Sequence, residues 1–387
     1  MTDQDTNKEQ GVRYLKRERE VLERFMPGFD QKLSSIPLAE REAIKNPCIG
    51  WLKEIRGQNL VIPKQYGGLG ASPLEIMQVH RAIGSRSPSL AIACTMHNFS
   101  ASTLVEYAIF GEEYGAALLE TIAGEGMLLA SGFGEARPGA RPLEMTMTAH
   151  VTKDEGWRIN GTKKPCTLSA SADFITAGVT AYGEDNVPHR AVALIPRDSA
   201  GIVQAPFWKN AILAGAESEQ LTLTDVEVPG DFVFLADNDE ALDPVELTGY
   251  VWLQMCLCAS YIGMGSALIE MVLQKGNKIS SVDRMSVLSD VESQFYAVER
   301  VAEGMKNGES TEELLSRIVS TRYATMSALA RSSMKCAELL GGMAFVKSMD
   351  VSYLTGATRA LAFHPPSRAF GSEALSRYYN GEILDLA

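Results

Sequence analysis

Two histidines stand in segments whose residue types could perform acid–base chemistry. His364 lies in "AFHPPSRAFG" (362–371), where a proline pair interrupts a helical pattern. Prolines break helices because they remove backbone donors and clash with the preceding turn. His97 lies in "ACTMHNFSAS" (93–102), on a predicted helix. Histidine titrates near neutral pH and serves as a general acid or base. The proline break therefore makes His364 and Ser367 candidate site residues, and His97 is a second histidine of the same chemical type. The alternative is that the prolines only end one helix and start another.

The other histidines and the cysteines do not indicate a metal site. The six cysteines form no Cys-x-x-Cys pair and no cluster with histidine, which are the spacings typical of zinc sites. We interpret the thiols as reduced, mostly buried and cytoplasmic. Three histidines fall in a predicted helix, a strand and a turn and are interpreted as structural, namely His80, His150 and His189.

Composition and charge limit the class of protein. The chain has 387 residues, enough for two or three domains at roughly 100–200 residues each. Its formal net charge of −12 argues against a nucleic-acid surface, which needs many Lys and Arg residues. The polar N-terminus lacks the apolar core of a secretory signal. The apolar segment 251–273 contains Gln254 and Glu270, so we expect a buried helix rather than a membrane span.

The elements that must position these residues fall into three regions. Residues 1–129 predict a helical domain, in which "SPLEIMQVHRAIGSR" (72–86) starts with a serine followed three residues later by glutamate, a capping box. Residues 130–236 alternate apolar and polar side chains between closely spaced turn residues, which predicts an antiparallel β domain. Within it, Asn160-Gly161 is a hairpin signal.

Residues 237–387 predict a C-terminal four-helix bundle. Long helical patterns separated by short connections are typical of antiparallel helix bundles. The fold class is therefore α+β and multidomain, with helices before and after the β domain. The four expected helices cover residues 245–276, 283–306, 309–341 and 368–381.

Several segments, in the same order along the chain, resemble acyl-CoA dehydrogenases. "VIPKQYGGLGASPLEIMQVHRAIG" (61–84) resembles the entry into that family's second helical layer. "RINGTKKPCTLSASAD" (158–173) is similar to its flavin-contacting β signature. "LTDVEVPGDFVF" (223–234) resembles the exit strand, and "CAELLGGMAF" (336–345) the glycine turn near the flavin. The resemblance covers roughly residues 36–387.

This resemblance implies a flavin, FAD or else FMN, between the β domain and the bundle. It also implies a homodimer or homotetramer in which a neighbouring subunit completes the flavin site. Family members remove an α proton from an acyl thioester while a hydride passes to the flavin. Carried over residue by residue, the cofactor-binding positions are Phe133, Gly134, Cys166, Thr167, Lys278, Gly341 and Gly342.

The chain departs from the family at its catalytic base. Where the family has a glutamate after the glycine turn, Pro365 or Ser367 stands here. Some members carry the glutamate on the first bundle helix, where this chain has Leu253 or Gln254. None of these side chains is a carboxylate, so none can abstract an α proton in the usual way.

Further departures affect the flavin contacts. The loop "GFGEARPGAR" (132–141) keeps Glu135 but has glycine and Ala140 in place of a threonine and a serine. Pro165 replaces a tryptophan, although Thr167 is kept. Lys278 falls near the arginine that binds the FAD diphosphate, and an ammonium is a less specific phosphate ligand than a guanidinium.

Three functions remain open. The first is a flavin-dependent oxidoreductase of an acyl thioester on CoA or a carrier protein, with His364 as base. The second is a monooxygenase that uses O2 and reduced flavin from a separate reductase, assisted by His97 and His364. Flavin monooxygenases of this fold look similar here, since they lack the glutamate and use histidines and a serine, and this resemblance implies that His364, Ser367 and His97 are catalytic. The third is a homologue that binds flavin or an acyl chain without redox chemistry.

Overall fold

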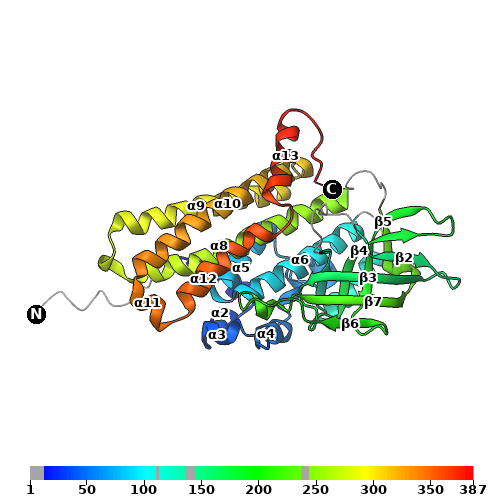
Figure 1. Cartoon of the computed structure of the whole chain (residues 1–387), viewed down its shortest axis with the longest axis horizontal. Helices are drawn as coiled ribbons and strands as arrows, with labels where there is room; N and C mark the ends of the chain where they lie inside the picture. Colours follow the sequence, from blue (N-terminus) through cyan, green and yellow to red (C-terminus); the bar gives the residue numbers. More distant parts are fainter. Residues whose placement is uncertain (1–12, 110–112, 136–144, 237–243, 387) are drawn as a thin grey trace, which may run out of the picture.

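The computed structural model describes residues 13–109, 113–135, 145–236 and 244–386. Helices form both ends of the chain and a sheet forms the middle, and the sheet lies at one end of an elongated molecule (Figure 1). The expected three-part order is thus confirmed. The first helical region consists of α1 (Lys16–Phe25), α2 (Phe29–Ser34), α3 (Leu38–Arg41), α4 (Cys48–Glu54), η1 (Gly57–Leu60), η2 (Lys64–Tyr66), α5 (Pro73–Arg86), α6 (Pro88–Ile109) and α7 (Glu113–Glu125).

The predicted capping box at the start of α5 is present. The Glu75 amide donates to the Ser72 hydroxyl, and the Ser72 amide donates to the Glu75 carboxylate over 2.8 Å. Both partners satisfy backbone donors that a helix start leaves unpaired. The start of α5 is therefore set by local sequence.

The middle region folds into one mixed sheet. Its strands are β1 (Leu129–Gly132), β2 (Thr148–Val151), β3 (Trp157–Cys166), β4 (Phe174–Tyr182), β5 (Pro188–Pro196), β6 (Ile202–Ala205), β7 (Glu219–Val228) and β8 (Val233–Leu235), with η3 (Ala214–Ala216) and η4 (Gly230–Phe232) between them. The order is β6-β7-β3-β2-β4-β5-β8, and β1 also pairs with β4.

The prediction of a wholly antiparallel β domain was wrong in one respect. Both β1 and β2 pair with β4 in parallel, while the other pairs are antiparallel. Alternation of apolar and polar residues reports only that a strand is half-buried, because side chains alternate between faces in either direction. Strand direction depends on the crossover of the chain, which the pattern does not contain.

The expected Asn160-Gly161 hairpin was also wrong, because both residues lie inside β3. The pairing of β3 with β7 is irregular between Ile159 and Gly161, as in a β-bulge. Gly161 has φ of 147°, and a Cβ there would lie 2.8 Å from the Met147 Cα. The glycine serves a close backbone approach rather than a turn.

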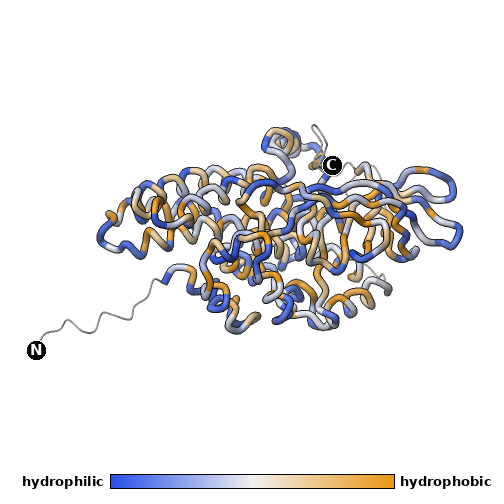
Figure 2. The backbone as a smooth tube through the Cα atoms, turned by 60° about the horizontal axis from the view of Figure 1, so that its bottom comes forward, coloured by the Kyte–Doolittle hydropathy of each residue, from blue (hydrophilic) through white to orange (hydrophobic). Residues whose placement is uncertain are grey.

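The C-terminal region is built around α8. Its elements are α8 (Pro244–Gln274), η5 (Gly276–Lys278), α9 (Ser281–Lys306), α10 (Thr311–Leu340), α11 (Gly342–Lys347), α12 (Asp350–Arg359), η6 (Ala360–Phe363) and α13 (Arg368–Tyr379). Helix α8 is long and apolar enough to cross a membrane, but 83% of its most apolar window is buried inside the protein. Figure 2 shows the apolar colouring along the inner helices and strands. The expected buried helix is confirmed.

The fourth helix of the bundle differs from the prediction. Helix α12 packs along α8 and α10, whereas α13 contacts α10 and projects outward from the bundle (Figure 1). The sequence pattern did not indicate α12, which follows the glycine turn at Gly341 and is only 10 residues long. The proline pair then redirects the chain before α13.

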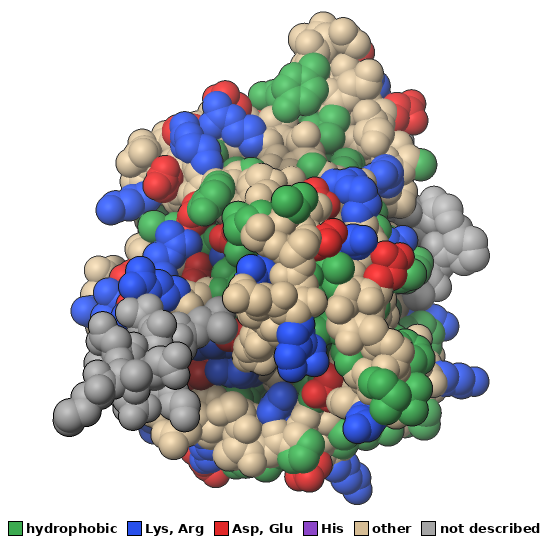
Figure 3. All heavy atoms as spheres, turned by 90° about the vertical axis from the view of Figure 1, so that its left-hand side faces the viewer, with side chains coloured by type: hydrophobic (Ala, Val, Ile, Leu, Met, Phe, Trp, Pro, Cys, Tyr) green, Lys and Arg blue, Asp and Glu red, His purple; other side chains and the backbone are tan. Residues whose placement is uncertain are grey.

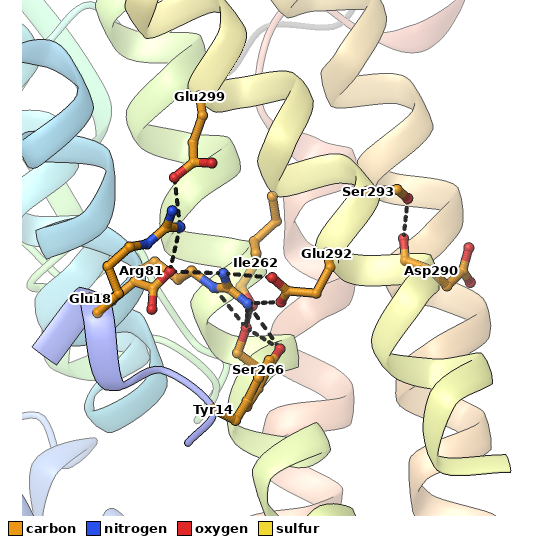
Figure 4. Close-up of polar contacts among 10 residues, drawn as sticks. Tyr14, Glu18, Arg81, Ile262, Ser266, Asp290, Glu292, Ser293 and Glu299 are labelled. Carbon is orange, nitrogen blue, oxygen red and sulfur yellow. Dashed lines mark hydrogen bonds and ion pairs between the residues drawn. The ribbon is translucent and has the colours of Figure 1, made fainter. Parts of the chain in front are cut away.

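A buried charge network fixes α1 to the core (Figure 4). The Arg81 side chain of α5 is 1% exposed and pairs with Glu18 of α1 and Glu292 of α9. It also donates to the hydroxyls of Tyr14 and Ser266. A buried ion network that is fully hydrogen-bonded holds its helices in one arrangement, because separating it would leave an unpaired charge.

Candidate active site

The His-Pro-Pro segment is held by the buried Arg322 of α10. Arg322 Nη1 donates to the carbonyls of His364 and Pro365, both over 2.9 Å, and Nη2 donates to the carbonyl of Pro366. The Arg322 side chain is 1% exposed, and no carboxylate among the described residues pairs with it. Three successive carbonyls therefore take the place of a counter-ion. The Tyr323 hydroxyl adds a bond to the Ser367 carbonyl over 3.0 Å.

The His364 ring is fixed by Tyr261 of α8. The Tyr261 hydroxyl lies 2.8 Å from His364 Nε2, and the two rings meet edge to face. Tyr261 is fully buried, and His364 is the one partner of its hydroxyl within the described residues. A buried hydroxyl needs an acceptor for its proton. We therefore assign the hydroxyl as donor to Nε2, so that the proton of the neutral ring lies on Nδ1.

Burial keeps both partners of this pair uncharged. Burial foremost, and the nearby positive charge of Arg322, lower the pKa of His364 to about 3. Burial also raises the pKa of Tyr261 well above its usual range. A histidine with so low a pKa is a weak base at neutral pH. The geometry thus supports His364 as a hydrogen-bond donor rather than as the base expected from sequence.

The two segments in which the resemblance places a catalytic glutamate contact each other. Gln254 Nε2 on α8 donates to the Pro365 carbonyl over 3.1 Å. None of the four candidate positions in these segments, Leu253, Gln254, Pro365 and Ser367, carries a carboxylate. Both side chains that bond to this carbonyl, and Tyr250 one turn before Gln254 on α8, have a buried polar atom without a partner in the described structure: Gln254 Oε1, Arg322 Nε and Tyr250 Oη. Unused buried polar atoms are uncommon and call for an explanation such as a bound ligand.

Ser367 and His97 have partners that support structural roles. The Ser367 hydroxyl accepts from the Phe370 amide and caps α13. His97 Nδ1 accepts from the Leu129 amide over 3.0 Å, and Nε2 donates to the Gln58 carbonyl over 2.8 Å. Burial lowers the pKa of His97 to about 4. Both ring nitrogens are therefore occupied, and a catalytic role of either residue stays a prediction that these contacts do not favour.

The sheet side of the site begins where β1 ends. The ring of Phe133 packs edge to face on Phe99 of α6, with centroids 5.1 Å apart. Gly134 comes so close to β3 that a Cβ would lie 3.0 Å from the Pro165 carbonyl oxygen. One turn after Phe99, Thr103 packs against Gly249 of α8. Contacts thus run from the sheet across α6 to the helix that carries Tyr250 and Gln254.

Two hydroxyls lie at the end of β3. Thr167 Oγ1 is 2.9 Å from Ser218 Oγ, and both side chains are buried. The neighbouring Cys166 is fully buried, and burial raises the pKa of its thiol to about 12, so it stays protonated. All six cysteines are buried and unpaired, as expected.

Glu135 has a structural partner in this region. Its carboxylate lies 2.6 Å from Lys163 Nζ, and both side chains are nearly fully buried. It also accepts from the Thr146 amide. The pair ties the loop after β1 to β3. Ala140, predicted to replace a flavin-contacting serine, lies outside the described residues.

Comparison with known proteins identifies the family. No profile of a known protein family matches the chain. Isobutylamine N-hydroxylase of Streptomyces viridifaciens is 38% identical over 380 residues, which cover 97% of this chain and 100% of the relative. The chain belongs to the acyl-CoA dehydrogenase-like flavoenzymes.

Solved structures agree with this family at the level of the fold. KijD3 in complex with FMN and a dTDP-linked amino sugar superposes with a TM-score of 0.82 at 17% identity, covering 95% of both chains. Butyryl-CoA dehydrogenase of Megasphaera elsdenii gives a TM-score of 0.81 at 14% identity, covering 94% of this chain and 98% of that one. Helices, mixed sheet and bundle therefore follow the acyl-CoA dehydrogenase-like plan.

The residues present fit the flavin that this family binds. The Thr167 and Ser218 hydroxyls on the sheet side can form hydrogen bonds to a ring edge. On the helix side, Tyr250 and Gln254 have unused hydrogen-bonding atoms. When bound, a flavin supplies two-electron redox chemistry that no side chain can perform. Among the described residues no cluster of His, Cys, Asp or Glu could hold a metal.

Three predicted cofactor residues lie elsewhere in the chain. Lys278 is exposed in η5, and Gly341 and Gly342 join α10 to α11. These turns lie at the end of the molecule that points away from the sheet (Figure 1). Within one chain, Lys278 and the two glycines therefore do not lie at the same site as Thr167. Figure 3 views this end, where apolar side chains are interspersed with Lys and Arg. Completion of a flavin-family site by a second subunit stays a prediction.

Sequence reasoning missed Arg322, Tyr261 and Tyr250. A signal existed for α8, since Tyr250, Gln254 and Tyr261 fall on one helical face at spacings of four and seven residues. No comparable signal marked Arg322, because one arginine in an amphipathic helix is normally a solvated charge.

Proposed function

We propose that the protein is a flavin-dependent monooxygenase that N-hydroxylates a small primary amine. The observation that carries this proposal is the contact of Gln254 with Pro365, because the two segments in which the resemblance places a catalytic base meet there and supply no carboxylate. Dehydrogenation of an acyl thioester needs a base for the α proton, and oxygenation of an amine does not. The full-length likeness to an isobutylamine N-hydroxylase supports the same choice.

The proposed reaction consumes a primary amine, O2 and reduced flavin. It gives an N-alkylhydroxylamine, water and oxidised flavin, so that one oxygen atom enters the new N–O bond and the other leaves as water. Reduced flavin, taken here as FMN, comes from a separate nicotinamide-dependent reductase. The arginine expected at an FAD diphosphate is absent from this sequence, and Lys278 stands near its position.

The chain's own residues have defined roles in this proposal. Arg322 fixes the His-Pro-Pro backbone and Tyr261 fixes the His364 ring. His364 then donates a hydrogen bond from Nδ1 to oxygen bound in the site. A preorganised donor in a buried site stabilises developing negative charge more than a donor in water does.

Oxygen labelling tests the proposed function. The purified protein is mixed with FMN, a flavin reductase, NADH and isobutylamine under 18O2, and the product is analysed by mass spectrometry. We expect N-isobutylhydroxylamine that carries one labelled oxygen atom, in amounts that depend on the enzyme. Bleaching of bound flavin by an acyl thioester without O2, and no labelled product from amines, would show a dehydrogenase instead.

A further inference from the structure

Two polar side chains with unused hydrogen-bonding atoms, Gln254 and Arg322, meet at the carbonyl of Pro365, and Tyr250 carries a third unused atom on the same helix as Gln254. Tyr250 and Gln254 are one turn apart on α8, and Arg322 reaches the same carbonyl from α10 over 2.9 Å. Their exposed fractions are 5%, 0% and 1%. We call these three residues the polar cluster. The unused atoms are an acceptor on Gln254, a donor on Arg322 and a hydroxyl on Tyr250. Such a set can hold a ligand that both donates and accepts hydrogen bonds.

The charge around the polar cluster is positive. Arg322 is its charged member; it donates to backbone carbonyls, lies over the Tyr323 ring, and forms no ion pair with a carboxylate among the described residues. Glu246, one turn before Tyr250, forms an ion pair with Arg190. His364, beyond Pro365, is neutral at working pH because its pKa is lowered to about 3.

Two further charged side chains belong to elements that pack around the polar cluster. Arg368 of α13 donates to Tyr323 and Ser327 on α10, and it adds a second positive charge on that side. Glu106 follows Thr103 on α6, the helix that packs against Gly249 of α8. Burial raises the pKa of Glu106. It is therefore the carboxylate that an experiment must exclude as a partner for the substrate.

We propose that the polar cluster binds the substrate nitrogen as a neutral amine and rejects the ammonium form. This inference rests on the proposed function. An amine N–H donates to Gln254 Oε1, and the nitrogen lone pair accepts from the Tyr250 hydroxyl or stays free for oxidation. Burial and a nearby cation both disfavour a protonated amine. An alkylammonium has a pKa near that of lysine, about 10.4, so binding at neutral pH releases one proton to solvent.

N-hydroxylation also requires the substrate amine in its neutral form. An ammonium has no lone pair to attack oxygen, whereas the neutral amine does. A carboxylate in place of Gln254 would hold the ammonium tightly and leave it unreactive. The cluster thus explains why an amide, rather than the family's glutamate, suits this position. The segment that closes the cluster is itself at the surface, since Phe363, Pro365 and Ser367 are exposed.

Calorimetry measures the released proton without turnover. Isobutylamine is titrated at pH 7 into protein loaded with oxidised FMN, in two buffers of different ionisation enthalpy. We expect about one proton released per amine bound. Gln254→Met should weaken binding about tenfold, the effect of losing one hydrogen bond in a buried site. Gln254→Glu should bind the amine with almost no proton release.

Other outcomes would overturn the inference. Amine binding without proton release contradicts it, and a loss of binding in Glu106→Gln would then identify Glu106 as the ammonium partner. If the heat of binding is too small, the KM for total isobutylamine decides. A fall of about tenfold from pH 7 to pH 8 supports neutral-amine binding, because the neutral fraction rises tenfold. A constant KM contradicts it.

The experiments can reject the proposed function and the proposed binding mode independently of each other. Proton release on amine binding, followed by no labelled hydroxylamine in the oxygen experiment, would retain the binding site and reject N-hydroxylation. Labelled hydroxylamine formed without proton release or pH-dependent KM would retain the function and reject this binding mode.

Discussion

The Tyr261 hydroxyl decides what His364 can do. The two ring nitrogens of a neutral histidine differ in role, because one carries the proton and the other accepts a hydrogen bond. The partner of one nitrogen therefore determines whether the other is protonated. Tyr261 occupies Nε2, which leaves Nδ1 as a donor. Residue type alone suggested a base, whereas the contact with Tyr261 favours hydrogen-bond donation, and the catalytic role of His364 stays a prediction.

Tyr261→Phe tests this assignment at the residue scale. Removing the hydroxyl frees Nε2 to take the proton, so the ring populates both tautomers. Nitrogen-15 NMR of histidine-labelled protein should show a single Nδ1-protonated form of His364 in the wild type and a mixture in the variant. We expect amine oxidation to slow by about ten- to a hundredfold, the range for loss of an orienting partner.

The spectrum separates this role from a purely structural one. A variant with an unchanged melting temperature and altered His364 nitrogen shifts supports the assignment. Identical nitrogen shifts in the wild type and Tyr261→Phe would refute it, whatever happens to the rate.

At the scale of elements, the crossing of α5 and α8 brings backbones into direct contact. A Cβ on Gly84 would lie 2.3 Å from the Ser260 carbonyl oxygen, and one on Gly263 would lie 2.3 Å from the Arg81 carbonyl oxygen. Both helices are buried there, so neither can move aside without disturbing its neighbours. The crossing fixes the face of α8 that carries Tyr250, Gln254 and Tyr261.

Gly84→Ala is expected to destabilise the protein by about 1–3 kcal/mol or more, because the added methyl overpacks this crossing. The matched control is Gly124→Ala in α7, where a Cβ meets nothing within 4 Å. Alanine favours helix at an open site and should stabilise by about 0.5–1 kcal/mol. Urea unfolding of both variants gives the two values. Equal effects would mean that the crossing tolerates a methyl group.

Over the whole molecule, buried neutral histidines couple stability to pH. Burial lowers the pKa of His80 and His364 to about 3 and that of His97 to about 4. The unfolded chain takes up protons near pH 6.5, and the folded chain does not. The contribution of these three neutral histidines to the free energy of unfolding is therefore complete above pH 6.5. It is lost as pH falls from 6.5 towards 4.

We expect the free energy of unfolding to fall between pH 6.5 and pH 5, by up to about 1.4 kcal/mol per pH unit for each histidine. Glu42 has the opposite effect on how the free energy of unfolding changes with pH, because burial raises the pKa of its carboxyl. Comparing the wild type with His80→Gln isolates one histidine. Parallel stability curves for the two proteins over this range would contradict the prediction.

The candidate site and the glycine turn lie at opposite ends of the molecule. The sheet, α6 and the start of α8 carry the candidate site, whereas η5 and α11 lie at the far end (Figure 1). Exposed apolar side chains at Met343, Phe345 and Val346 accompany the glycine turn. This arrangement is consistent with the predicted homodimer or homotetramer, which stays a prediction, as do the cytoplasmic compartment and the domain limits at residues 129 and 236.

The sequence by itself determined the order of the three regions, with helices before and after a β region. Local signals sufficed for this, since Ser72 and Glu75 cap α5 and the apolar run at 251–273 marks a buried helix. It also determined that no carboxylate stands at the family's base positions, because that statement concerns residue types. Together with the resemblance to acyl-CoA dehydrogenases, the lack of that carboxylate predicted a flavoenzyme with unusual chemistry.

Only the tertiary structure decided how the site works. The direction of β1 and β2 against β4 and the bulge at Gly161 depend on the path of the chain. The partners of His97 and His364 come from residues far away in sequence, and hydrogen bonds at those distances leave no local pattern. Arg322 on the His-Pro-Pro carbonyls, and Gln254 against Pro365, exist because folding brings α8, α10 and the chain after α12 together.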